Sequence, residues 1–511
     1  MRKNCIASLP TFPRFRHGTD YACNRAGQCN NHITRRIEMK FFQYLEQEQL
    51  DKIHEATLEL LENTGIYATS ERFLKTCAGV GLKVEGDRVF FPRDLVAKGL
   101  AAAPSKFSTW GRDGKYEIQW GARKAYNHTC VGTPFILDVE TGQKRDVLLK
   151  DLEDFVRVAD ALPATDIVSC IFPTDIPQHA VVTVQTAAMV KNTTKPLRIC
   201  IESAHETQFI IDVLSAAVGG LENLQKKPIA YLEISSVSPL SYAEGPGNGL
   251  LDVVEAGLPL GIIPCPMMGA TGPMTLIGSV AMHNAEIVAG IVVAELVKPG
   301  APVIMSPRVT FMEMGSGLGL WAAPEMGLAA IASAQMALYY DIPCTVTGYS
   351  CASKLNDQQS AFEAMFNTLL PALGGVDVLG ASGSLDNALI SSYEKLIMDD
   401  EISSMIHRVL RGETVDEETL AVSVTDDICK SGKGNFLGHK HTFKHVRTEL
   451  WQPVLSDRKS YGAWAQDALS FEDRAKALAK QLLAEHRPEP LAPGALAQVE
   501  AAVEAAIKAG E

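Results

Sequence analysis

A chain of 511 residues is too long for one small core, and its 46% hydrophobic residues and 40 glycines suit a large α/β domain with additions. Its net charge of −13, from 47 basic and 60 acidic residues, argues against a nucleic-acid-binding protein, which needs a positive face. Polar residues interrupt the most apolar window, 277–297, so we expect a helix packed on a sheet there and no membrane span.

The cysteines and histidines do not form a recognisable metal motif. Eleven cysteines are scattered without Cys-x-x-Cys spacing, and most lie in apolar runs, as reduced cysteines do in cytoplasmic proteins. His439, His441 and His445 form the only histidine cluster, and Lys440 and Lys444 surround it with positive charge. We therefore predict a cytoplasmic protein without a metal site, in which this cluster has a structural role.

Residues 1–38 differ from the rest of the chain. They are polar, show no periodicity and lack the apolar core of a signal peptide, whereas Met39 begins a more ordinary protein sequence. We expect this segment to be disordered or a spurious extension of the reading frame.

Residues 39–150 read as an α+β section. Apolar residues at helical spacing predict a helix from Glu46 that stops before Gly65, and a second helix follows over 71–78. Short strands then alternate with turns, and residues 138–145 are typical of a hairpin.

From Asp151 the pattern changes to repeated strand and helix units, which predict a parallel sheet. Apolar strand-like runs begin, about 30 to 43 residues apart, near Ile167, Leu197, Ile229, Leu260, Val303, Cys344 and Val376. Seven units approach the eight of a TIM barrel, which we place at 151–445. The eighth strand could lie in 434–439 or in the N-terminal section. A doubly wound open sheet is the competing fold, but no Gly-x-Gly-x-x-Gly follows the first strand.

The last part of the chain, residues 446–511, is rich in Ala, Leu, Glu and Lys and predicts a peripheral helical extension.

The loops that follow barrel strands are where binding groups collect, and residues 257–363 contain three such loops rich in Gly, Pro and Ser. Candidate aromatic residues are Trp110, Phe311, Trp321 and Tyr349, although each could instead be part of the core. Glu313 lies in a Gly-rich loop and Glu233 lies inside a strand, where a charge is costly unless it is paired. Glu233 could therefore belong to an ion pair or to a site.

Several short segments, in the same order, resemble the trimethylamine methyltransferase family of corrinoid-dependent methyltransferases. The matching residues are 54–65, 138–142, 159–163, 192–196, 269–273, 285–286, 324–325, 353–354 with 357–358, 399–401 and 436–442. The similarity that these segments mark covers nearly everything from Met39 to about residue 475.

The resemblance implies a TIM barrel whose mouth accepts the cobalamin of a separate corrinoid protein, with no cofactor bound tightly by this chain. It also implies methyl transfer from a methylated amine to Co(I), in one-carbon metabolism of the kind that supports methanogenesis. The founding members carry pyrrolysine, whereas this chain contains standard residues only. A quaternary amine such as a betaine is therefore the expected substrate, and we expect a homo-oligomer.

The chemistry that the resemblance implies, together with the positions of residues in loops and strands, suggests two sets of residues. Residues expected to contact the substrate, through aromatic faces or a carboxylate near the ammonium group, are Trp110, Glu233, Phe311, Glu313, Trp321 and Tyr349. Residues expected to face the corrinoid are Gly269, Ala270, Thr271, Ser353, Lys354, Asp357, Gln358, Gly383 and Asp386. The turn at 269–273 could bind an anion through its backbone amides or be only a tight turn.

Two other functions stay open from the residues alone. The barrel could be a lyase or hydrolase with Lys354 or Glu233 as its acid or base, or it could bind betaines without catalysis.

Overall fold

A computed structural model describes residues 41–201, 203–432 and 434–510. The expectation for residues 1–38 lies outside this part of the chain.

Eight short parallel strands form a closed ring, which excludes the open doubly wound sheet. In order around the ring they are β6 (Tyr126–Thr129), residues 167–168, β9 (Leu197–Ile201), β10 (Ala230–Ile234), β12 (Leu260–Ile262), β14 (Val303–Met305), β17 (Thr345–Thr347) and β18 (Val378–Ser382). The ring closes where β18 pairs with β6. The predicted TIM barrel is thus confirmed, and its remaining strand is β6 of the N-terminal section, not residues 434–439.

This first strand lies before residue 150. The predicted boundary at 150/151 therefore falls inside the barrel, between its first and second strands, and the barrel begins by Tyr126. The strand was hard to recognise because Tyr-Asn-His-Thr is mostly polar, although three of these four residues are buried.

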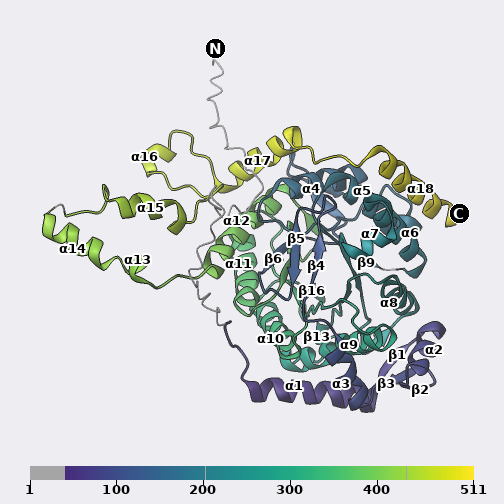
Figure 1. Ribbon diagram of the computed structural model, residues 1–511. Helices are drawn as coiled ribbons and strands as arrows, with labels where there is room; N and C mark the ends of the chain where they lie inside the picture. Colours follow the sequence, from purple (N-terminus) through teal and green to yellow (C-terminus); the bar gives the residue numbers. More distant parts are fainter. Residues whose placement is uncertain (1–40, 202, 433, 511) are drawn as a thin grey trace, which may run out of the picture. The chain divides into compact units, whose positions relative to one another are not determined.

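A long helix follows each strand, and these helices surround the ring (Figure 1). They are α4 (Leu149–Ala161), α5 (Val181–Asn192), α6 (Ala204–Val218), α8 (Glu244–Ala256), α9 (Leu276–Val297), α10 (Pro324–Tyr340), α11 (Gln358–Leu373) and α12 (Tyr393–Leu410). Helix α9 is long and apolar enough to cross a membrane by length and composition, but 83% of its apolar window is buried, as in a core helix.

A hairpin covers the amino-terminal end of the barrel. It consists of β4 (Phe107–Trp110) and β5 (Glu117–Trp120), paired antiparallel. Trp120 packs edge-on against Tyr231 of β10, with ring centroids 4.9 Å apart, within a buried cluster that includes Ile167 and Ile304. Because these side chains are apolar and close-packed, this end of the barrel is sealed.

The rest of the N-terminal section packs on the outside of the barrel. Helix α1 (Gln47–Glu59) continues through a π-helical turn to Gly65, whose φ of 67° requires glycine at the predicted stop. The predicted second helix is α2 (Glu71–Gly79). Strands β1 (Ile66–Ala68), β2 (Lys83–Glu85) and β3 (Arg88–Phe90) form a small sheet with β11 (Ser241–Tyr242), and α3 (Arg93–Ala102) contacts α9.

The predicted hairpin near residue 140 is confirmed as β7 (Phe135–Leu137) and β8 (Lys144–Asp146).

The C-terminal part contains two different kinds of helix. Helices α17 (Phe471–Glu485) and α18 (Pro493–Ala509) pack on barrel helices, α17 on α12 and α4 and α18 on α6 and α5. Between α12 and α17 lie α13 (Glu417–Leu420), α14 (Val422–Ser431), α15 (Lys440–Glu449) and α16 (Tyr461–Trp464). Among the described residues of this intervening arm, 412–470, only Ile428 and Leu455 are buried.

Candidate active site

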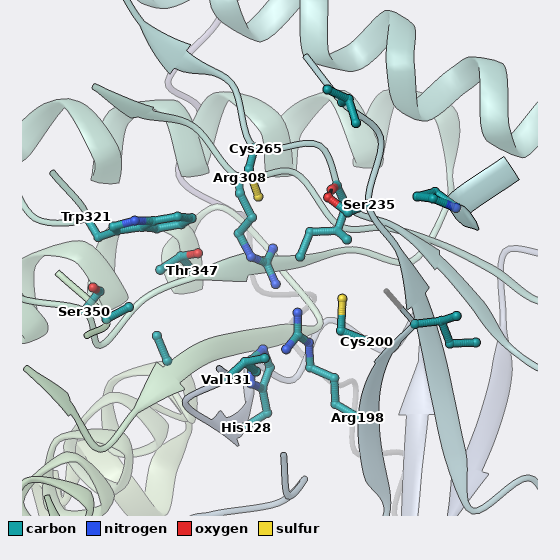
Figure 2. Close-up of a pocket in the computed structure, with 16 residues that line it drawn as sticks. His128, Val131, Arg198, Cys200, Ser235, Cys265, Arg308, Trp321, Thr347 and Ser350 are labelled. Atoms are coloured by element: carbon teal, nitrogen blue, oxygen red, sulfur yellow. Dashed lines mark hydrogen bonds between the residues drawn. The ribbon is translucent and has the colours of Figure 1, made fainter. Parts of the chain in front are cut away.

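A cavity of about 430 Å³ lies at the carboxyl ends of the barrel strands, within the size range of small-molecule sites. Its lining comes from nearly every strand end: His128, Val131, Arg198, Cys200, Ile201, Ser235, Val237, Pro246, Ile263, Cys265, Arg308, Trp321, Thr347, Ser350, Ala381 and Ala388. Figure 2 shows the labelled members converging on one space. Since a barrel's active site is built at this end, the cavity is the candidate active site.

Strand alternation selects the residues that reach the barrel interior. On β9 these are Arg198 and Cys200, and the register pairs Cys200 with Glu233 on β10. The next position around the ring is Gly261 on β12, which pairs with Glu233 on its other side. Only glycine fits at residue 261. A Cβ there would lie 2.9 Å from Oγ of Ser306 and would also enter the space that the Glu233 side chain occupies.

Two buried arginines share one buried carboxylate just inside the cavity. Arg198 forms an ion pair with Oε2 of Glu233, and Nη2 of Arg308 lies 4.0 Å from its Oε1. Arg308 is also fixed by two hydrogen bonds that its Nη1 donates, to the carbonyl oxygens of Pro307 at 2.9 Å and Thr345 at 2.6 Å. Glu233 thus belongs to a barrel-interior ion pair, one of its two predicted alternatives.

The electrostatics of the two arginines differ. Burial opposes the charge of Arg198, but the adjacent Glu233, together with Tyr231 and Cys200, outweighs burial and raises the pKa of Arg198. For Arg308, burial lowers the pKa, and repulsion by the positive charge of Arg198 lowers it further. Glu233 raises it, but it lies farther from Arg308 than from Arg198 and does not offset these effects. Arg308 is therefore the less well compensated charge.

His128 contributes a neutral ring to the cavity wall. Its Nδ1 lies 2.7 Å from the carbonyl oxygen of Thr129, which can only accept, so Nδ1 carries the proton and Nε2 is unprotonated. Burial and the two nearby arginines hold the pKa of His128 well below its usual range. Gly380 makes room for this ring, since a Cβ there would stand 2.1 Å from Nε2.

Trp321 is the predicted aromatic residue that lines the cavity. It follows the hairpin of β15 (Thr310–Glu313) and β16 (Leu318–Leu320), which is inserted between β14 and α10. Its backbone N–H donates to Oδ1 of Asn387 at 3.1 Å, which ties this loop to the one after β18. Figure 2 shows its ring at one side of the cavity, near Thr347.

The three other aromatic candidates do not line this cavity. Trp110 lies in the hairpin that covers the opposite end of the barrel, where the ammonium of Lys227 is 4.4 Å from its ring. Phe311 packs in a hydrophobic cluster outside the cavity. Tyr349 is wholly buried in the main core, and its neighbour Ser350 lines the cavity in its place.

Glu313 is exposed at the turn between β15 and β16, where it accepts a hydrogen bond from the backbone of Gly315 at 3.2 Å, and it does not line the cavity.

The turn at Gly269, Ala270 and Thr271 is a tight turn and not a free anion nest. The backbone N–H groups of Ala270 and Thr271 both donate to the carbonyl oxygen of Met267, at 3.0 and 2.9 Å, and that of Gly269 donates to Gly272 at 3.0 Å. These amides are therefore already satisfied within the turn.

The polar loop after β17 caps a helix. Asp357 accepts hydrogen bonds from the backbone N–H of Ser360 at 3.0 Å and from the hydroxyl of Ser353 at 2.8 Å, which makes it the N-cap of α11. Lys354 is exposed, donates to the carbonyl of Ala352 and lies 3.4 Å from Asp386. Gln358 is the exposed first residue of α11.

Gly383, predicted to face the corrinoid, is buried instead. Its N–H donates to Asp399 at 2.8 Å, and Phe155 and Leu396 cover its Cα.

The histidine cluster gathers around a carboxylate. Possible ligand atoms of Glu418, His441 and His445 lie within 4.8 Å of one another. Lys444 already donates to Oε1 of Glu418 at 2.7 Å, and Nε2 of His445 lies 2.9 Å from the same oxygen. The carboxylate is thus compensated by the protein's own groups.

Sequence reasoning missed Arg198 and Arg308. Arg198 is a charged residue inside the strand Leu-Arg-Ile-Cys-Ile, the same signal that marked Glu233, and Arg308 lies three residues after the end of β14. His128 was in neither set of predicted site residues.

Comparisons with known proteins agree with this architecture. The family described as trimethylamine methyltransferase (MTTB) matches residues 16–508. A glycine betaine methyltransferase from Desulfitobacterium hafniense strain Y51 is 33% identical over 463 residues, covering 90% of this chain and 96% of the relative. A trimethylamine methyltransferase MttB from D. hafniense strain DSM 10664 / DCB-2 is 30% identical over 448 residues, covering 87% and 90%.

The fold has a solved counterpart. The crystal structure of the Methanosarcina barkeri monomethylamine methyltransferase (MtmB) superposes with a TM-score of 0.52 at 12% identity, covering 92% of this chain and 89% of that one. At this identity the likeness concerns the fold. The extent of the family match and the identity to curated relatives show that the chain is a methyltransferase and belongs to the trimethylamine methyltransferase family.

Proposed function

We propose that this enzyme transfers a methyl group from a small quaternary amine, such as a betaine, to the Co(I) corrinoid of a partner protein. The observation that carries the proposal is that, among the described side chains, no carboxyl group, lysine or protonated histidine lines the cavity. The ionisable residues of the lining are His128, Arg198, Cys200, Cys265 and Arg308.

His128, Cys265 and the two arginines are poor general acids at neutral pH. His128 is neutral and its one N–H is committed to Thr129. Burial raises the pKa of the Cys265 thiol to about 11, and a guanidinium does not give up its proton in proteins. Transfer of a methyl group from neutral trimethylamine would have to expel a dimethylamide anion, whereas transfer from a quaternary ammonium expels a neutral tertiary amine and needs no proton donor.

The chain's contribution is then positioning and exclusion of water. Trp321 offers a ring face to an ammonium group at the side of the cavity. Because the amino-terminal end of the barrel is closed by packed side chains, the substrate would bind near the opposite end, at the mouth of the barrel. A bound corrinoid would supply the nucleophile there, and the exposed residues of the surrounding loops, Ala270, Thr271, Lys354 and Gln358 among them, are available to contact it.

The other enzyme classes have less support. Glu233 is held by two arginines, and Lys354 is exposed and does not line the cavity. Neither is placed to act as an acid or base on a ligand in the cavity.

A substrate panel tests the proposal. Glycine betaine, carnitine, choline, proline betaine and trimethylamine are each incubated with the enzyme and Co(I) cobalamin, and methylation of the cobalamin is followed by its absorbance. At least one quaternary amine should react and trimethylamine should not. Methylation with trimethylamine alone would refute the proposal.

The partner, assembly and location of the chain are part of the same proposal. A Co(I) nucleophile needs a reducing compartment, and the described cysteines form no disulfide, which supports a cytoplasmic location.

Self-association is supported by the arm, because it exposes large apolar side chains including Val415, Val422, Leu437 and Phe443. A permanent apolar interface fits a second copy of the chain better than a corrinoid protein that must dissociate.

A further inference from the structure

Three charged side chains of the cavity leave one positive charge uncompensated. Arg198 and Arg308 contribute two positive charges and Glu233 one negative charge, and all three are buried. His128 is neutral and adds none. An uncompensated charge in a buried site is costly, so a ligand that brings one negative charge would be strongly favoured.

The arginines also have unused hydrogen-bond donors. Within the described part of the chain, Nε and Nη1 of Arg198 and Nη2 of Arg308 are buried and have no acceptor within hydrogen-bond distance, Oε1 of Glu233 being 4.0 Å from Nη2 of Arg308. Figure 2 shows the two guanidinium groups approaching each other from opposite sides of the cavity, Arg308 from one wall and Arg198 from the other. Buried donors of this kind are normally satisfied, which indicates that an acceptor arrives with a ligand.

We propose that Arg198 and Arg308 form a carboxylate subsite. Glu233 neutralises one of their two positive charges, so that the subsite favours a ligand with a single negative charge. The inference rests on the proposed function, and it restricts the substrate to a zwitterion that carries a carboxylate as well as a quaternary ammonium. A planar carboxylate presents two oxygens to the forked guanidinium donors.

The rest of the cavity is consistent with one orientation of such a zwitterion. The carboxylate binds between the arginines, and their excess positive charge repels the ammonium group, which lies instead towards Trp321. Choline lacks the carboxylate and would leave the donors unsatisfied. The subsite thus separates amino-acid betaines from simple quaternary amines of similar size.

Binding measurements on the full chain separate this inference from methyl transfer. Calorimetry is done with glycine betaine, with choline, and with 3,3-dimethylbutanoate, which keeps the carboxylate but has an uncharged tert-butyl group and cannot donate a methyl group. The two carboxylates should bind at least about tenfold more tightly than choline, as expected for charge-assisted hydrogen bonds. Choline binding as tightly as glycine betaine would overturn the subsite.

Substitutions assign the effect to the arginines. Arg308→Gln should weaken both carboxylates about ten- to hundredfold and leave choline unchanged, and Arg308→Lys should fall between, because it keeps the charge without the fork. Arg72→Gln is the control, since Arg72 lies in an exposed ion pair with Asp252, and circular dichroism verifies the fold of each variant. Unchanged carboxylate binding in Arg308→Gln would overturn the inference.

Glu233→Gln gives an effect of opposite sign. Removing the competing carboxylate should tighten binding of 3,3-dimethylbutanoate, whereas a purely structural role for Glu233 would weaken it. Sulfate, a dianion, serves as the comparison, and tighter binding of sulfate than of 3,3-dimethylbutanoate to the unmodified enzyme would contradict a site for one negative charge. Loss of carboxylate binding in Arg308→Gln, in an enzyme that methylates no cobalamin, would support the subsite and refute only the proposed function.

Discussion

A Cβ at Gly261 would stand 2.7 Å from Cγ of Glu233, closer than real side chains approach. The bare backbone of β12 is therefore what allows the carboxylate on β10 to lie between two arginines. The glycine at position 261 therefore determines where the negative charge of Glu233 lies in the candidate active site.

Gly261→Ala should displace Glu233 and weaken its ion pair with Arg198. Overpacking of this kind costs about 1 to 3 kcal/mol of stability, and the rate of methyl transfer should fall with it. Thermal unfolding and the cobalamin assay measure the two effects. Ala at Gly300, where a Cβ meets nothing within 4 Å but φ is 81°, is the control for backbone strain alone. Equal stability loss with full activity in both variants would contradict a role for the Gly261 contact in the site.

Trp321 and Tyr349 should respond differently to truncation. Trp321→Ala should raise the KM for the quaternary amine about tenfold, while Trp321→Phe should keep most of the affinity, because a ring face holds the cation. Tyr349→Ala should instead destabilise the protein by about 3 to 5 kcal/mol, as buried aromatic truncations do. Steady-state kinetics and denaturant unfolding distinguish these roles, and an unchanged KM in Trp321→Ala would remove Trp321 from the substrate site.

Glu295 should make the protein less stable as the pH rises. It is buried near the end of α9 and accepts a hydrogen bond from the backbone of Gly300 at 2.7 Å, and burial raises its pKa from 4.5 to about 7. Between these two values the folded protein holds a proton that the unfolded chain has lost, so stability falls as pH increases through this window. The full effect is at most about 3 kcal/mol.

Glu295→Gln should remove this contribution, so the variant should lose less stability than the parent between pH 4.5 and 7. Urea unfolding at several pH values measures the difference. Parallel pH profiles of the two proteins would show that the Glu295 carboxyl does not titrate abnormally.

Chelation should leave the enzyme intact. Since Lys444 already compensates Glu418 in the histidine cluster, dialysis against EDTA should change neither the melting temperature nor the rate of methyl transfer. Stoichiometric zinc in the purified protein, lost together with stability on dialysis, would assign a metal to Glu418, His441 and His445.

The barrel was predictable from the chain because apolar runs at a regular interval leave few alternatives to a parallel sheet. Strand β6 was not, since its buried residues Asn127, His128 and Thr129 are polar and read as a loop. The substrate site was harder still. The charge pattern identified Glu233, but its partners Arg198 and Arg308 come from positions 35 residues before it and 75 after it, and only closure of the ring brings them together.

Tyr349 shows the same limit at finer scale. The sequence indicated that a site loop begins after β17, but which of Tyr349 and Ser350 faces the cavity depends on the direction of the chain as it leaves the strand. A one-residue difference there exchanges a core aromatic for a cavity hydroxyl.

The hairpin of β4 and β5, which seals the amino-terminal end of the barrel, also imposes an order on turnover. Among the described residues, Trp120 and Tyr231 pack across that end, so we expect the cavity to exchange small molecules with solvent through the mouth. If a corrinoid protein covers the mouth during methyl transfer, the amine must bind before it and the demethylated amine must leave after it. The kinetics should therefore be those of a compulsory sequence in which the small molecule enters first and departs last.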